Sequence, residues 1–222
     1  PDGTTLNTLD VWKSYLDACA KGGMNKSRVF LLEVPWVAPP AVKDHPELSP
    51  WALKPDGTYD LARFSLPFWD KLDAVLAHGA KLGIVFELSL FDETGLAAGN
   101  GDRWAFHPFH AKNGGPIAGL AGCPTFYDLS NPANRAAQEA YVAYLLARTA
   151  AYPNVSYELN SEMNRRGTAG ELGLRWAEHW AAFFREHDPY AHLISLSVAT
   201  NPGAYFLIEG LAIANLRRDT PP

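Results

Sequence analysis

The fold is decided by Val155-Ser156-Tyr157-Glu158-Leu159-Asn160, a short stretch that Ser161 and Glu162 follow directly. Its branched and aromatic residues predict a β-strand, and segments with helical spacing lie before and after it. Polar side chains at Glu158 and Asn160 stand where a buried strand normally carries apolar ones. The stretch therefore predicts a strand with functional side chains toward its carboxyl end.

Strands and helices alternate on both sides of this stretch. Helical spacing covers residues 9–19, 69–80 and 176–187, and a further helix at 131–151 begins with Asn131 as its N-cap and Pro132 at its first position. Strand composition marks residues 28–34, 84–91, 192–198 and 211–216 in addition to 155–160. This alternation predicts parallel strands joined by right-handed crossovers.

Two architectures fit that alternation, a doubly wound sheet and a (β/α)₈ barrel. The connections before the strands are short, whereas those after 28–34 and 84–91 run to about 30 and about 40 residues, a length that is usually functional. Long loops after the strands build the active face of a barrel. No Gly-x-Gly-x-x-Gly motif or phosphate-binding loop follows any strand. We therefore expect an α/β fold of the barrel type.

Composition narrows the class of protein further. Of the 222 residues, 47% are hydrophobic and 19% are charged, which predicts a globular chain with a buried core. The formal net charge is -5 and no basic tract occurs, so we expect no nucleic-acid partner. No apolar run approaches the roughly 18–20 residues that span a bilayer, so we expect no membrane partner.

Residues 154–162 resemble the fourth-strand motif of clan A glycoside hydrolases, (β/α)₈ barrels with two catalytic glutamates. Residues 25–31, 56–64 and 81–91 are similar to cellulase-like members of family 5. The resemblance implies that Glu162 is the general acid/base and that 28–34 and 211–216 are the second and sixth strands. It thus implies one barrel domain over 1–222 that lacks its first strand and its last two.

The resemblance implies retaining cleavage of β-glycosidic bonds in a poly- or oligosaccharide, which needs two carboxyl groups about 5–5.5 Å apart. The nucleophile would then lie outside this chain, on the seventh strand. Ser161 stands where the family carries an asparagine beside the sugar, and Asn160 precedes it, so both are candidate substrate contacts. These departures leave a non-catalytic carbohydrate-binding barrel as the alternative. Substitute carboxylates within the chain are Glu33, Glu87, Asp92 and Glu93, for each of which a structural or substrate-contact role is the simpler interpretation.

Aromatic and imidazole side chains form a second group of candidates. Trp104, His107 and His110 lie in one loop and Trp36 follows the second strand, so each is a candidate sugar contact, with a buried loop anchor as the alternative for the tryptophans. Arg28 is a further candidate, with a structural ion pair as its alternative. His107 and His110 also permit a metal-dependent hydrolase, but their loop spacing is a weak zinc signal.

The expected partners follow from these assignments. We expect a carbohydrate substrate, neither a cofactor nor a metal, and Asp92 among the substrate contacts at the end of the third strand. The remainder of the barrel, or a second chain, would complete the fold. If the substrate is a polysaccharide, a secreted or periplasmic location is favoured.

Overall fold

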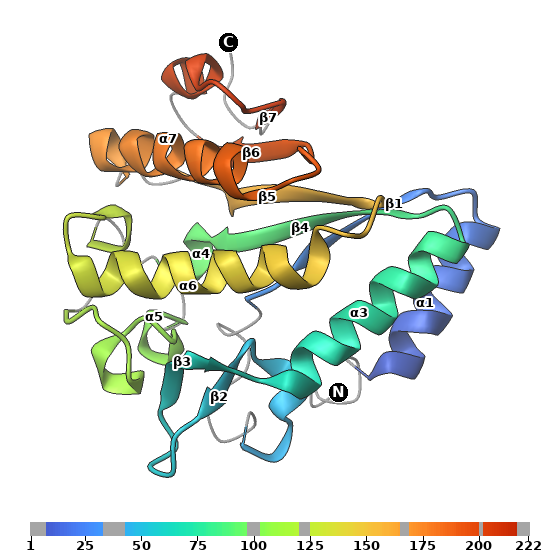
Figure 1. Cartoon of the computed structure of the whole chain (residues 1–222), viewed down its shortest axis with the longest axis horizontal. Coiled ribbons are helices and arrows are strands. Elements are labelled where there is room, and N and C mark those ends of the chain that lie inside the picture. The colour runs from blue at the N-terminus through green and yellow to red at the C-terminus, as the bar shows by residue number, and fades with distance from the viewer. Residues whose placement is uncertain are drawn as a thin grey trace.

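A computed structural model of the chain describes residues 8–32, 43–96, 103–119, 125–164, 169–199 and 202–216. Within these ranges five parallel strands form one sheet in the order β1-β4-β5-β6-β7 (Figure 1). The strands are β1 (Lys26–Phe30), β4 (Val85–Asp92), β5 (Val155–Ser161), β6 (Ile194–Val198) and β7 (Ile213–Leu216). All five expected strands are thus confirmed, although the first begins two residues earlier than predicted and ends at Phe30.

Helices connect these strands where the sequence predicts them. They are α1 (Leu9–Lys21), α3 (Leu66–Lys81), α6 (Pro132–Thr149) and α7 (Gly170–His187). The α6 N-terminus follows its prediction, because the Asn131 side chain accepts hydrogen bonds from the amides of Ala133 and Asn134. This alternation of strand and helix matches a partial (β/α)₈ barrel.

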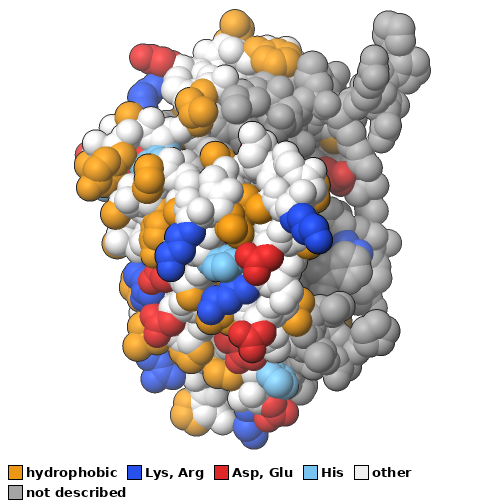
Figure 2. All heavy atoms as spheres, turned by 90° about the vertical axis from the view of Figure 1, so that its right-hand side faces the viewer, with side chains coloured by type: hydrophobic (Ala, Val, Ile, Leu, Met, Phe, Trp, Pro, Cys, Tyr) orange, Lys and Arg blue, Asp and Glu red, His pale blue; other side chains and the backbone are white. Residues whose placement is uncertain are grey.

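Helices α1 and α3 lie side by side at the β1 end of the sheet (Figure 1). His78 on α3 lies 2.8 Å from Asp17 on α1, measured between Nε2 and Oδ1. Among the residues that Figure 2 colours, acidic, basic and histidine side chains are interspersed on this side of the molecule and form no patch of one sign. Among the described residues, no helix is both long and apolar enough to cross a membrane.

The two faces of the sheet differ in chemistry. Tyr157 on β5 points toward the helices, with its hydroxyl 2.8 Å from that of Thr149 on α6 and its ring against Phe184 on α7. The next residue, Glu158, points to the opposite face and contacts Arg28 on β1. Because side chains alternate along a strand, the helices cover one face and the polar side chains belong to the other. In a closed barrel that other face lines the interior.

The first long connection contains secondary structure that was not expected from the sequence. A short helix, η3 (Pro46–Leu48), leads into an antiparallel hairpin of β2 (Trp51–Leu53) and β3 (Tyr59–Phe64). Its turn is set by Asp56, which accepts from the amide and hydroxyl of Thr58, and by Gly57, whose φ is 84°. Trp51 anchors the hairpin in the core and is fully buried.

The second long connection, after β4, is built from short helices. These are α4 (Glu93–Leu96), α5 (Arg103–Phe106), η4 (Ala111–Asn113) and η5 (Thr125–Tyr127). A last short helix, η6 (Pro202–Leu207), follows β6. Both long connections therefore follow strands and lie at their carboxyl ends, as expected for the active face of a barrel.

Close packing of α3 against the sheet gives a prediction for stability. A Cβ added at Gly79 would lie 2.3 Å from the Phe86 ring, which is fully buried. We expect Gly79→Ala to lower the free energy of unfolding by about 1–3 kcal/mol, despite the helix propensity of alanine. Urea denaturation measures the change, and adding Phe86→Leu should recover part of it.

Gly203→Ala is the control, because a Cβ there meets nothing within 4 Å. Its expected effect is within about 0.5 kcal/mol. A Gly79→Ala variant as stable as this control would contradict the tight contact between α3 and β4.

Candidate active site

Glu162 comes directly after β5, at the edge of the sheet where the parallel strands end. The preceding Ser161 pairs in register with Asp92, the last residue of β4. The following Met163 pairs with β6, because its amide donates to Ser197 at 2.8 Å and its carbonyl accepts from Ala199 at 2.9 Å. Glu162 is therefore fixed between two neighbours whose backbones belong to the sheet.

The backbone of Glu162 is in the left-handed region, with φ at 55°. For a residue with a Cβ this conformation costs roughly 1–2 kcal/mol, so it persists only where the surrounding structure imposes it. Asn164 is also left-handed, with φ at 60°, but asparagine tolerates that region better. Strain of this kind is typical of functional sites, and here it falls on the carboxylate singled out by the sequence.

A buried network lies beside this segment. Asn160 is fully buried and donates from Nδ2 to the Tyr127 hydroxyl at 2.8 Å. That hydroxyl in turn donates to Glu93 Oε2 at 3.0 Å, and the same oxygen accepts from the Asn164 amide. Glu93 is 1% exposed. The network joins the end of β4, the short helix η5 and both sides of Glu162.

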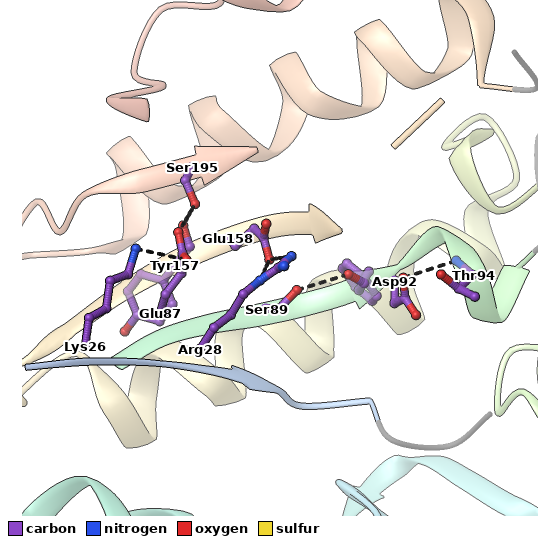
Figure 3. Close-up of polar contacts among 10 residues, drawn as sticks. Lys26, Arg28, Glu87, Ser89, Asp92, Thr94, Tyr157, Glu158 and Ser195 are labelled. Atoms are coloured by element: carbon purple, nitrogen blue, oxygen red, sulfur yellow. Dashed lines mark hydrogen bonds and ion pairs between the residues drawn. The ribbon is translucent and has the colours of Figure 1, made fainter. Parts of the chain in front are cut away.

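Asp92 is the carboxylate that shares the strand edge with Glu162. Its Oδ1 accepts from the Thr94 amide at 3.1 Å, and both residues lie at the carboxyl end of β4 (Figure 3). Burial raises the pKa of Asp92, the nearby Glu162 raises it further, and Thr94 and Arg103 oppose that rise. Two carboxylates and an arginine thus interact electrostatically at one edge of the sheet.

The interior face of the sheet carries a second set of charges, drawn in Figure 3. Arg28 on β1 donates from Nε at 2.8 Å to the fully buried Glu158 on β5. Burial raises the pKa of Glu158, while Ser89 and Arg28 oppose the rise. This contact favours the ion-pair interpretation of Arg28.

Glu87 on β4 is held in the same way. It lies 3.1 Å from Lys26 Nζ and accepts from the Ser195 hydroxyl at 2.8 Å. Burial raises the pKa of Glu87, but Ser195 and Lys26 outweigh it, so the pKa lies below its usual value. Glu87 and Glu158 are therefore engaged as partners of basic side chains across the sheet.

The tryptophan and histidine candidates are largely buried within their loop. Trp104 is 3% exposed and donates from Nε1 to the Gly119 carbonyl, and His107 is 2% exposed and accepts from the Phe109 amide. Burial lowers the pKa of His107 to about 3, which leaves its ring neutral at neutral pH. His110 is partly exposed and accepts from Lys112. These contacts favour loop anchoring for Trp104 and His107.

Metal binding receives no support from the described ranges, in which no group of three or more His, Cys, Asp and Glu side chains is placed to hold an ion. His107 and His110 each already accept a backbone amide on Nδ1. The candidates Trp36 and Glu33 lie outside the described residues.

Comparison with known proteins adds the family context of the fold. No protein-family model matches the sequence, and no curated protein matches it. A glycoside hydrolase family 5 structure from Bacteroides vulgatus matches with a TM-score of 0.54 at 17% identity, over 92% of this chain and 36% of that one. The endo-β-1,4-mannanase from Thermotoga petrophila matches with a TM-score of 0.60 at 17% identity, over 86% and 39%.

The chain shares its fold with part of these glycoside hydrolase family 5 structures. A family 5 mannosidase from Rhizomucor miehei also shares it, with a TM-score of 0.57 at 13% identity, over 91% of this chain and 50% of that one. The chain thus spans only about a third to a half of the length of these barrels. At such identities the likeness concerns the fold.

Two residues of the site were not expected from the sequence, Tyr127 and Asn164. Tyr127 lies in the stretch between β4 and α6 that shows no hydrophobic period, and Asn164 lies in the polar run after β5. Their roles depend on contacts with Glu93, which is 34 residues from Tyr127 and 71 from Asn164 along the chain. The one indication in the sequence was Glu93, their shared contact, which was already a candidate carboxylate at the end of a strand.

The raised pKa of Asp92 gives a prediction with a definite sign. A raised folded-state pKa means that the contribution of Asp92 to stability is present below the unfolded pKa, near 3.9, and is lost as pH rises through the folded pKa. Asp92→Asn keeps an acceptor for Thr94 but cannot ionise. We therefore expect its stability relative to wild type to increase between about pH 3 and about pH 7, measured by urea denaturation.

Asp56→Asn is the matched comparison, because Asp56 also accepts an amide two residues along the chain. Hydrogen bonds from Thr58 lower the pKa of Asp56, so its contribution is present above the unfolded pKa and is lost as pH falls. The relative stability of this variant should change with pH in the opposite direction. The same sign for both variants would contradict the burial of Asp92.

Proposed function

We propose that the chain is the part of a retaining β-glycoside hydrolase that carries the general acid/base, Glu162. The observation that supports this most strongly is the position of Glu162, held in a left-handed backbone at the end of the fourth barrel strand. In this mechanism Glu162 donates a proton to the leaving oxygen and then, as a carboxylate, accepts one from the attacking water. The nucleophile comes from the remainder of the barrel or a second chain.

The candidate carboxylates within the described residues support an external nucleophile. Glu87 and Glu158 serve as ion-pair partners, and Glu93 is 1% exposed and accepts two hydrogen bonds. Asp92 is the described carboxylate that interacts with Glu162, and we assign it to the substrate contacts together with the partly exposed His110. Since two of the similar structures are a mannanase and a mannosidase, β-linked mannans are among the first substrates to test.

A carbohydrate-binding barrel without catalysis is the second candidate function. It is favoured by Ser161, which replaces the family's asparagine and is itself 2% exposed. Binding of a β-glycan to the full-length protein with no release of product would support this candidate, whereas measurable release would exclude it.

Glu162→Gln in the full-length protein tests the proposed role. Loss of a general acid/base typically lowers turnover by about 10²–10⁴-fold, so we expect a loss of that size on the best β-glycan substrate. The leaving group of an aryl glycoside with a strongly acidic phenol departs without protonation, so the first chemical step should be slowed less on such substrates. Steady-state and burst kinetics on both substrate types measure the difference.

Glu171→Gln is the control, because this exposed glutamate on α7 forms an ion pair with the exposed Arg175. We expect its turnover to equal that of the wild type. Wild-type turnover in Glu162→Gln would overturn the assignment.

A further inference from the structure

The segment that carries Glu162 is held on both sides by one buried carboxylate. On the strand side, Asn160 Nδ2 donates to the Tyr127 hydroxyl at 2.8 Å, and that hydroxyl donates to Glu93 Oε2 at 3.0 Å. On the loop side, the Asn164 amide donates to the same oxygen. Asn160 lies two residues before Glu162 and Asn164 lies two residues after it. The hydrogen bonds from both asparagines therefore lead to Glu93, Asn160 through Tyr127 and Asn164 directly.

The direction of each hydrogen bond follows from the donors available. A tyrosine hydroxyl has one proton, and here it goes to the carboxylate, so the tyrosine oxygen is left to accept from the asparagine amide. The carboxylate only accepts, which suits the two donors that converge on it. Glu93, Asn160 and Asn164 are all at least nine-tenths buried, so loss of one of these hydrogen bonds would leave buried polar groups without that partner.

These two contacts act on a segment whose neighbouring residues are bonded to two different strands. Ser161 is aligned with β4 and Met163 is bonded to β6, so the strained turn of Glu162 lies between two strands that the sheet holds apart. The Asn164 amide is the next backbone group, and its bond to Glu93 opposes relaxation of the left-handed backbone at Asn164 and, through Met163, at Glu162.

We propose that Glu93 is a positioning residue that, with Tyr127, holds the Glu162 carboxyl group in the orientation needed for proton transfer to the leaving oxygen. This inference rests on the proposed function of Glu162 and extends it to two residues that do not touch the substrate. Geometry matters here because a displacement of about 1 Å at a reacting group lowers rates by as much as about 100-fold.

Two variants of the full-length protein test the proposal. Tyr127→Phe removes the hydroxyl that links Asn160 to Glu93, and Glu93→Gln keeps the side-chain size but removes the charge. We expect each to lower kcat at least about 10-fold on substrates with poor leaving groups, with KM little changed, and to slow the first chemical step much less on aryl glycosides with strongly acidic leaving groups. A general loss of folded protein would lower both rates equally.

Tyr157→Phe is the matched control, because it removes a buried hydroxyl from the helix side of the same strand, where the partner is Thr149. It should leave the dependence on the leaving group as in the wild type. Hydrogen exchange adds a readout independent of activity: the Asn164 amide should exchange faster in Tyr127→Phe and Glu93→Gln than in Tyr157→Phe.

The outcomes separate this proposal from the one it rests on. Wild-type turnover in Glu162→Gln means that the proposed function fails. Loss of turnover in Glu162→Gln, with Tyr127→Phe indistinguishable from Tyr157→Phe in leaving-group dependence and in exchange at Asn164, means that only the positioning role fails. If Glu93→Gln does not fold, Tyr127→Phe decides the question, because Phe fills the same ring volume.

Discussion

Buried carboxylates on the interior face of the sheet impose the constraint on which the rest of the structure depends. An ionised carboxylate removed from water costs several kcal/mol unless a partner offsets it. Glu158 on β5 meets this condition through Arg28 on β1, and Glu87 on β4 does so through Lys26 on β1 and Ser195 on β6. The contact of Glu158 with Arg28 extends from β5 across β4 to β1, and that of Glu87 with Ser195 extends from β4 across β5 to β6. These charges therefore favour one order and one register of the strands.

The register decides where the chemistry lies. With β4 and β5 aligned so that Asp92 is opposite Ser161, the next residue, Glu162, emerges at the shared carboxyl edge. Met163 then joins β6, and the backbone between the two strands adopts the left-handed conformation that carries the candidate acid/base. The register that these charges favour therefore also places the strained backbone of Glu162 at the edge of the sheet.

Much of this arrangement could be predicted from the sequence, because it depends on local patterns. The α6 start at Asn131 and Pro132 and the five strands follow from caps, periodicity and residue type, which neighbouring residues determine. The position of Glu162 after its strand was predictable for the same reason. The hairpin after β1 was not predicted, although the turn chemistry of Asp56 and Gly57 was present in the sequence.

The contacts that decide the role of each side chain could not be read in this way. Nothing local to Arg28 indicates a partner 130 residues away, and nothing local to His107 indicates that its ring is buried against Trp104. The same holds for Tyr127, whose hydrogen bonds to Glu93 and Asn160 reach the ends of two different strands. Residue type and spacing singled out the strand edge as the candidate site, whereas three-dimensional packing distinguished the residues at that edge from the loop anchors.

The most direct measurement is the crystal structure of the full-length protein with a bound β-linked oligosaccharide. If Glu162 is the acid/base of a retaining enzyme, we expect a second carboxyl group about 5–5.5 Å from that of Glu162, on the opposite side of the glycosidic bond. A separation of about 6.5–9.5 Å would instead indicate an inverting enzyme. A bound sugar with no second carboxylate across the bond from Glu162 would contradict the proposed role of Glu162 as the acid/base of a retaining enzyme.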